Sequence, residues 1–428
     1  MRLYDADFHI KPMNDPPNHH SETSLSRKFL SRLMDEKTGQ KVFYSIVIAH
    51  FVIYWVIGMV IYPIYYLNTE GYNVFGVDFV LGAKLYEQFL ANPANIYQVT
   101  DPSPFLNLPS FMLYVIAWCW PISLVMDLYS PVFLMIYALA GVLKNLLSCY
   151  IIFKIMKTKK IQKLLGKSIF SNPFIIMSIY MATPIHYLEY LIGQHDHMVG
   201  LCFLIGIYFL MKDKDHYAML FWSIAIIFKL TIIFFIIFFI FRDFKKKIFK
   251  NLSYALIPQI PTIVMVLIWP NYITDFLNTN IIRLDTYVSF FYQGNFASLL
   301  FENFNIPLII STIVLATLLL PSQVYLITEQ KNKMNEIEKL ILIVLIYINI
   351  LPVHFATHSI SFLGIVGIWF AINNRNLNQN IKYIKILLAI PFLSIISWMF
   401  FPYFGFLFFG ILIAFDIFLL TSKIKNRE

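Results

Sequence analysis

Five short segments of this chain place polar or ionisable residues where apolar runs begin, end or are interrupted. A charged side chain inside an apolar run is costly to bury in a membrane, and such residues usually serve a function. Asp78 opens the segment 78–90, in which apolar residues recur at helical spacing. Its carboxylate either caps this helix and complements the helix dipole, or acts as a general base that takes a proton from an acceptor hydroxyl.

Lys229 lies near the middle of the apolar run 217–241, too deep for its ammonium to reach water easily if the run is one straight helix. Lys229 either forms a buried ion pair that aids packing or binds a phosphate group, and we favour phosphate binding. A second polar cluster, Gly-Gln-His-Asp-His at 193–197, opens another apolar run and is typical of a helix cap. His195 and His197 are two positions apart, on different faces of a helix, which disfavours a metal pair.

The last two segments lie late in the chain. Residues 293–298, Gln-Gly-Asn-Phe-Ala-Ser, form an ordinary turn when taken alone. His354 and His358 are four positions apart, so one helical face presents both. That spacing suits zinc, but the glutamate of the HExxH pattern is missing, and hydrogen bonding to an anionic head group is favoured.

The composition indicates a membrane protein. Of the 428 residues, 59% are hydrophobic and 13% are charged. The charged share is about half that of a soluble protein. Apolar runs recur in series, and several reach the roughly 20 residues that cross a bilayer. The net charge of +9 lies in short connectors, as in cytoplasmic loops, which disfavours a nucleic-acid-binding face. We therefore expect an all-α polytopic membrane protein of about ten to twelve transmembrane helices.

The charge pattern also predicts the domain organisation. Residues 1–42 form a cytoplasmic polar tail, 43–421 the transmembrane domain and 422–428 a cytoplasmic tail. A first lumenal loop, 67–108, holds an interfacial helix, and 271–305 form a second large lumenal loop. Two segments do not fit a simple alternation of crossings. Placing both basic connectors, 157–167 and 242–250, on the cytoplasmic side requires 217–241 to form two short halves that meet near Lys229. It also requires 109–126 to be something other than a simple crossing.

At these five segments the sequence resembles the GT-C superfamily of glycosyltransferases, which use polyprenyl-phosphate sugars. It looks closest to membrane mannosyltransferases, either the bacterial lipid-glycan type or the GPI first-mannose type. The matching segments are 77–79 for the acidic motif of the first lumenal loop, 92–97 for the motif that ends in tyrosine, 193–194 for Gly-Gln, 229–232 for the intramembrane lysine motif, 295–298 for the loop motif and 352–358 for the late histidine motif. The chain departs from the family pattern at Gly76, where a first aspartate is usual, at Ile232, where proline is usual, and in the wider spacing of the two histidines.

The resemblance implies a GT-C-like bundle and an inverting transfer of a hexose, mannose first, from a polyprenyl- or dolichyl-phosphate donor. The acceptor would be lipid-linked or a glycan at the lumenal or extracytoplasmic face, in the endoplasmic reticulum or a prokaryotic plasma membrane. Asp78 would be the catalytic base, with Asp101 and Asp196 as reserve carboxylates. The residues expected to contact the donor phosphate or substrate are Lys229, His354, His358, Arg283, Gln194, Asn295 and Tyr97.

The resemblance implies no metal site and no obligatory cofactor, although a divalent cation near Asp78 stays open, and no nucleic-acid partner. Two other classes also stay open: a polytopic transporter or lipid flippase, and a non-catalytic subunit of a membrane glycosylation complex. Transporters often contain paired repeats with matching broken helices. The chain has no second copy of the Asp78 loop or of the Lys229 segment, which counts against a transporter.

Overall fold

The computed structural model describes residues 35–56, 77–99, 107–166, 168–183, 195–242, 248–279, 336–350 and 360–373, together with residues 105, 186, 189, 190, 193, 310, 313 and 314. Within these residues all regular structure is helical and no strand occurs, so the all-α expectation is confirmed there. The described elements are α2 (Glu36–Val56), α4 (Val77–Ala91), η2 (Pro93–Gln98), α5 (Phe111–Ser123), α6 (Pro131–Met156), α7 (Lys159–Leu165), η3 (Ile169–Ser171), α8 (Pro173–Ala182), α10 (Asp196–Met211), α11 (Asp215–Phe228), η4 (Leu230–Ile232), α12 (Ile233–Arg242), α13 (Ile248–Leu256), η5 (Ile257–Gln259), α14 (Ile260–Ile268), α15 (Asn271–Leu277), α19 (Glu336–Ile350) and α20 (Ile360–Asn373).

Local sequence signals fix where two of the long helices begin. Ser130 precedes α6, and its hydroxyl accepts a hydrogen bond from the backbone N–H of Phe133 at 3.3 Å, with proline as the first helical residue. Asn172 precedes α8 in the same way and accepts from the N–H of Phe174 at 3.1 Å. A polar cap followed by proline satisfies a free N–H and pre-sets the helical φ, so both starts follow from the sequence.

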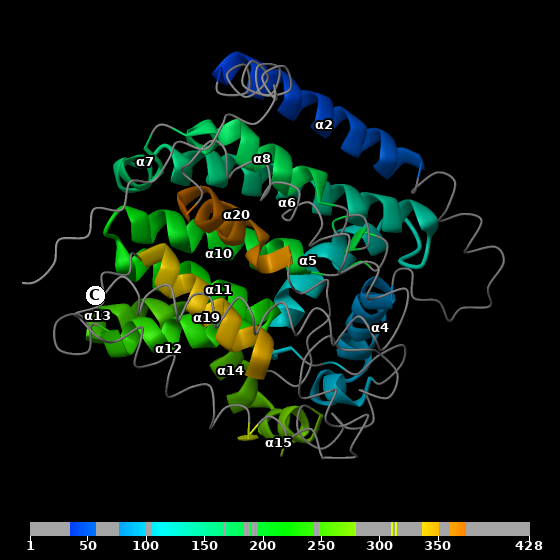
Figure 1. The fold of residues 1–428 in the computed structure, drawn as a ribbon. Helices are drawn as coiled ribbons and strands as arrows, with labels where there is room; N and C mark the ends of the chain where they lie inside the picture. Colours follow the sequence, from blue (N-terminus) through cyan, green and yellow to red (C-terminus); the bar gives the residue numbers. More distant parts are fainter. Residues whose placement is uncertain are drawn as a thin grey trace, which may run out of the picture.

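The helix α10 lies at the centre of the described bundle, packed against α6, α11 and α20 (Figure 1). Nearly all of its side chains are buried, as expected for a helix that is apolar on every side. Gly206 permits the close approach of α11, because a Cβ atom at this position would lie 2.2 Å from the indole nitrogen of Trp222. Gly364 similarly brings α20 close to Leu204.

Two ion pairs show which helix ends lie together. Glu36 at the start of α2 pairs with Lys157 at the end of α6, with Nζ 3.2 Å from the carboxylate. Lys160 of α7 pairs with Asp213, in the turn between α10 and α11. We call the end of the bundle that holds these two ion pairs the basic end. The helices α4 and α5 lie toward the opposite end, which we call the α4 end (Figure 1).

The helix predicted to break at Lys229 does so. The helix α11 ends at Phe228, Lys229 has extended backbone angles, and α12 begins after one short turn, η4. The indole of Trp222 and the ring of Phe235 lie 5.8 Å apart, whereas 13 residues of straight helix would separate their Cα atoms by about 20 Å. The chain therefore reverses at Lys229, and the expectation of two short halves is confirmed.

Two described helical stretches, Met135–Met156 and Ile248–Ile268, are long and apolar enough to cross a membrane. The first exposes Leu139, Leu143 and Leu147 on one face, each between 37% and 53% accessible. The helix α5 has 13 residues and a length of about 20 Å, which is less than the roughly 30 Å of a bilayer core. Its length thus agrees with the expectation that 109–126 is not a simple crossing.

A helix is present at the predicted position 78–90, as α4, and it packs against α5. The first described helix begins before the predicted start of the transmembrane domain at residue 43. The helix α2 starts at Glu36, inside the expected polar tail 1–42, because Asp35 accepts hydrogen bonds from the backbone N–H and hydroxyl of Thr38 and so caps it.

Candidate functional site

A glycine turn brings the start of α4 onto the start of α10. Gly193 has φ of +79°, a conformation that side chains other than glycine rarely adopt. A Cβ atom at this position would lie 3.0 Å from Cβ and 3.3 Å from the backbone nitrogen of Phe79. The backbone of this turn therefore touches the residue after Asp78, which joins two of the motifs that the sequence singled out.

Asp196, the first residue of α10, holds the ammonium of Lys229. The Lys229 Nζ lies 2.5 Å from both carboxylate oxygens, and Ser361 of α20 donates to the same carboxylate at 3.3 Å. Asp196 is fully buried, while the Lys229 side chain keeps 20% of its accessibility. The break in the α11–α12 hairpin thus places the lysine at the N-terminus of α10, where the carboxylate also complements the helix dipole.

Asp78 lies within electrostatic reach of this pair. Its side chain is half-buried, and desolvation raises the pKa of Asp78 to about 6, an effect that the Lys229 ammonium opposes and the Asp196 carboxylate reinforces. Residues 78, 196 and 229, distant in sequence, therefore form one charged cluster at the α4 end. A carboxyl with a pKa near 6 is half-ionised at about pH 6 and mostly ionised at neutral pH, as suits a general base.

A further carboxyl lies behind the cluster. Glu189 is completely buried, and its Oε2 lies 3.0 Å from Nδ1 of His197, which is 2% exposed. Burial and the neighbouring Asp196 carboxylate hold the pKa of Glu189 well above its ordinary value, which favours its protonated form. A protonated Glu189 adds no second buried negative charge beside Asp196.

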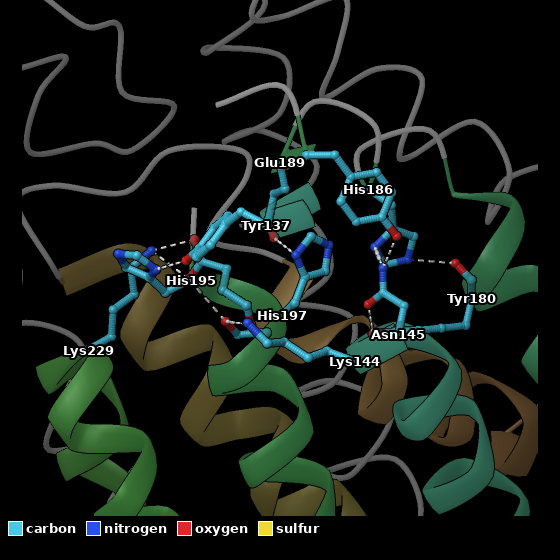
Figure 2. Close-up of polar contacts among 12 residues, drawn as sticks. Tyr137, Lys144, Asn145, Tyr180, His186, Glu189, His195, His197 and Lys229 are labelled. Carbon is cyan, nitrogen blue, oxygen red and sulfur yellow. Dashed lines mark hydrogen bonds and ion pairs between the residues drawn. The ribbon is translucent and has the colours of Figure 1, made fainter. Parts of the chain in front are cut away.

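His195 and His197 point to different partners, as their spacing predicted. The Nδ1 atom of His195 lies 2.5 Å from the hydroxyl of Tyr137 (Figure 2). The ring of His195 packs on Phe111 and Tyr114, whereas the ring of His197 stacks on Tyr190. Among the described residues no group of three or more histidine, cysteine, aspartate or glutamate side chains is arranged to hold a metal ion.

Lys144 of α6 is a second cation near His195, within electrostatic reach of its ring as Lys229 is. Its Nζ donates to the hydroxyl of Tyr114 at 2.9 Å and lies between 5.4 and 5.7 Å from the ring centroids of Tyr114, Trp118 and Tyr137. Within the described residues no carboxylate forms an ion pair with it. This second cation is therefore held by aromatic faces and a hydroxyl.

A separate polar network fills the space between α2, α6 and α8. Asn145 accepts from the hydroxyl of Tyr180 at 3.0 Å, lies 3.0 Å from Nδ1 of His186, and donates to the hydroxyl of Tyr190, which also contacts His50 (Figure 2). These groups satisfy one another in the interior, so the network is typical of helix association inside an apolar bundle.

The contacts of Tyr97 are structural. Its hydroxyl donates to the carbonyl of Asn107 at 2.9 Å, and its buried ring packs against Phe105, Tyr272 and Phe276. These contacts close the loop that follows α4 and are made with residues outside the Asp78 cluster. The predictions for Asp101, Gln194, Arg283, Asn295, His354 and His358 lie outside the described residues.

Sequence reasoning brought Asp78, Asp196 and Lys229 forward, and the structure places these three together. It missed Lys144 and Glu189. Lys144 carries the same signal as Lys229, a lone cation inside the apolar run 129–153. Glu189 lies only a few residues before the Gly193 turn, but nothing in its neighbours marks it as buried.

Comparisons with known proteins give no relative: no family model, no curated protein and no solved structure matches the chain.

Proposed function

We propose that the protein is a multi-pass membrane glycosyltransferase of the GT-C type, inverting, that moves a hexose from a polyprenyl- or dolichyl-phosphate donor to a lipid-linked or glycan acceptor. Mannose is the first candidate for the hexose. The observation that carries the proposal is the meeting of Asp78, Asp196 and Lys229 at the α4 end.

The location of the cluster supports a site on the side opposite to the cytoplasm. The basic residues Lys157 and Lys160 lie at the other end of the bundle, and positive residues favour the cytoplasmic side. The helix α10 joins the two ends with 16 residues, a length of about 24 Å. Between the two ends of the bundle, the exposed apolar faces of α6 and of Ile248–Ile268 suit contact with lipid.

The chemistry needs one carboxylate. Asp78 takes the proton of the acceptor hydroxyl, the acceptor oxygen attacks the anomeric carbon, and the bond from that carbon to the phosphate oxygen breaks. The electron pair of this bond leaves with the polyprenyl phosphate, whose charge nearby cations stabilise. A single displacement of this kind inverts the anomeric configuration and requires no protein nucleophile.

The Asp78→Asn variant tests the proposal. Purified protein in nanodiscs, given polyprenyl-phosphate mannose labelled in the sugar and a lipid acceptor pool, is expected to lose at least about a hundredfold of its transfer rate, the usual contribution of a general base. Glu87→Gln is the matched control, an exposed acid of the same helix. Full transfer by a folded Asp78→Asn protein would remove Asp78 from the role.

A transporter or flippase is the second candidate, and two observations favour it. Lys229 lies at a break between two short helices, and transporters bind substrates at such broken helices. Its pairing with Asp196 also resembles the paired charges of proton-coupled carriers. Movement of a labelled lipid-phosphate sugar across the vesicle membrane, without formation of a new glycoside, would support this function over transfer.

A further inference from the structure

A chain of hydrogen bonds joins Lys144 to the ring of His195. The ammonium of Lys144 donates to the hydroxyl of Tyr114 at 2.9 Å, the two tyrosine hydroxyls lie 3.2 Å apart, and the hydroxyl of Tyr137 lies 2.5 Å from Nδ1 of His195. The members come from α5, α6 and the residue before α10. Figure 2 labels three of them, Lys144, Tyr137 and His195. The chain ends beside Asp196 and Lys229.

The direction of these bonds follows from which groups carry protons. An ammonium only donates, so the Tyr114 oxygen accepts from Lys144. If the Tyr114 proton points to Tyr137, the Tyr137 proton points to Nδ1 of His195, and every proton has an acceptor. In the reverse order, the Tyr114 proton has no acceptor among the described side chains. The first order therefore places the ring proton of His195 on Nε2.

The charges near His195 keep the ring neutral. Burial lowers the pKa of His195 to about 3, and the ammonium groups of Lys144 and Lys229 lower it in the same direction. The Asp196 carboxylate neutralises Lys229, whereas no carboxylate of the described residues pairs with Lys144. On this side of the cluster, the Lys144 ammonium therefore remains without a described carboxylate as its ion-pair partner.

We propose that His195 binds an oxygen of a lipid-linked phosphate through its Nε2–H, and that Lys144, Tyr114 and Tyr137 are positioning residues that fix the ring in this tautomer. The proposal rests on the proposed function for the nature of the ligand. A neutral N–H donor near the Lys144 ammonium, which forms no ion pair with a described carboxylate, suits an anionic oxygen. The apolar, exposed side chains of Leu139 and Leu143 on the same helix suit the lipid chain.

Nitrogen NMR of protein labelled with ¹⁵N-histidine tests the tautomer directly, with the His195 signals assigned from their loss in His195→Gln. We expect a bare Nδ1 and a protonated Nε2 in the free protein. Tyr137→Phe and Lys144→Met should each shift the ring toward a mixture of tautomers. The matched control is Lys154→Met, because Lys154 covers the ring of Tyr150 on the same helix at 5.1 Å, away from the site. A protonated Nδ1 in the unaltered protein would overturn the proposal.

Binding is tested with geranyl phosphate, and inorganic phosphate and geraniol serve as the comparison probes. We expect geranyl phosphate to move the Nε2–H signal of His195, and His195→Ala to weaken its binding about tenfold or more. His195→Gln, which keeps an N–H donor near the Nε2 position, should recover part of this loss. If geranyl phosphate leaves the His195 signal unmoved, the proposal is overturned. If inorganic phosphate moves the signal as much as geranyl phosphate does, the claim that the phosphate is lipid-linked is overturned. Absence of transfer by the unaltered protein would refute the enzyme function alone and leave these NMR results intact.

Discussion

The ion pair between Asp196 and Lys229 allows the two interpretations of the lysine to be separated by a double-mutant cycle. Asp196→Asn and Lys229→Met each remove one charge of a pair in which Nζ lies 2.5 Å from both carboxylate oxygens. Because Asp196 is fully buried and Lys229 is 20% exposed, the remaining partner stays largely out of water. Each single change is therefore expected to lower the free energy of unfolding by about 3–5 kcal/mol.

The double variant is expected to lose less than either single variant, since it leaves no unpaired charge. Asparagine at 196 keeps an oxygen for the hydroxyl of Ser361, so this contact stays in place. The coupling free energy should then be at least about 3 kcal/mol, measured by equilibrium unfolding in detergent micelles. The exposed pair of Lys160 and Asp213, with side chains 43% and 79% accessible, is the matched control, for which about 0–1 kcal/mol is expected.

Additive single losses for Asp196 and Lys229 would refute this reasoning. The double variant also answers the functional question, because it folds and lacks the Lys229 ammonium. If that ammonium stabilises the leaving phosphate, the double variant has no transfer activity. If the pair serves packing alone, transfer persists at a rate close to that of the unaltered protein.

Three further predictions follow from the geometry. The proposed base Asp78 has a pKa of about 6, so kcat/KM should rise about tenfold per pH unit below pH 6 and level off above it. A flat pH–rate profile from 5 to 7 would contradict the proposed role. Gly193→Ala should lower transfer strongly, because the positive φ of Gly193 and its 3.0 Å approach to Phe79 leave no room for a methyl group. The control Gly82→Ala in α4 meets nothing within 4 Å and should retain activity. Equal effects of the two changes on transfer would argue against the role of the Gly193 turn. Asp213→Cys should react with a membrane-impermeant maleimide from the cytoplasmic side and Asp127→Cys from the other side, and labelling of both from one side would contradict the topology.

Several features of the fold could be predicted from the sequence because they depend on local pattern. Apolar runs at helical spacing predict helices wherever they occur, as for α4 and α6. The break at Lys229 also followed from the sequence, although indirectly. It came from the requirement that both neighbouring basic connectors lie on the cytoplasmic side, and the chain reverses there so that Phe235 packs near Trp222.

The sequence by itself determined which residues are out of place in an apolar chain: Asp78, Asp196 and Lys229 were marked by their charge alone. Only the tertiary structure decided which of them meet. The pairing of Lys229 with Asp196, the approach of Gly193 to Phe79 and the hydrogen-bonded chain from Lys144 to His195 all join helices that are distant in sequence. Periodicity reports which face of a helix is apolar, but not which neighbour covers that face. That choice depends on close packing between helices, as at Gly206 and Trp222, where one missing side chain sets the distance between two elements.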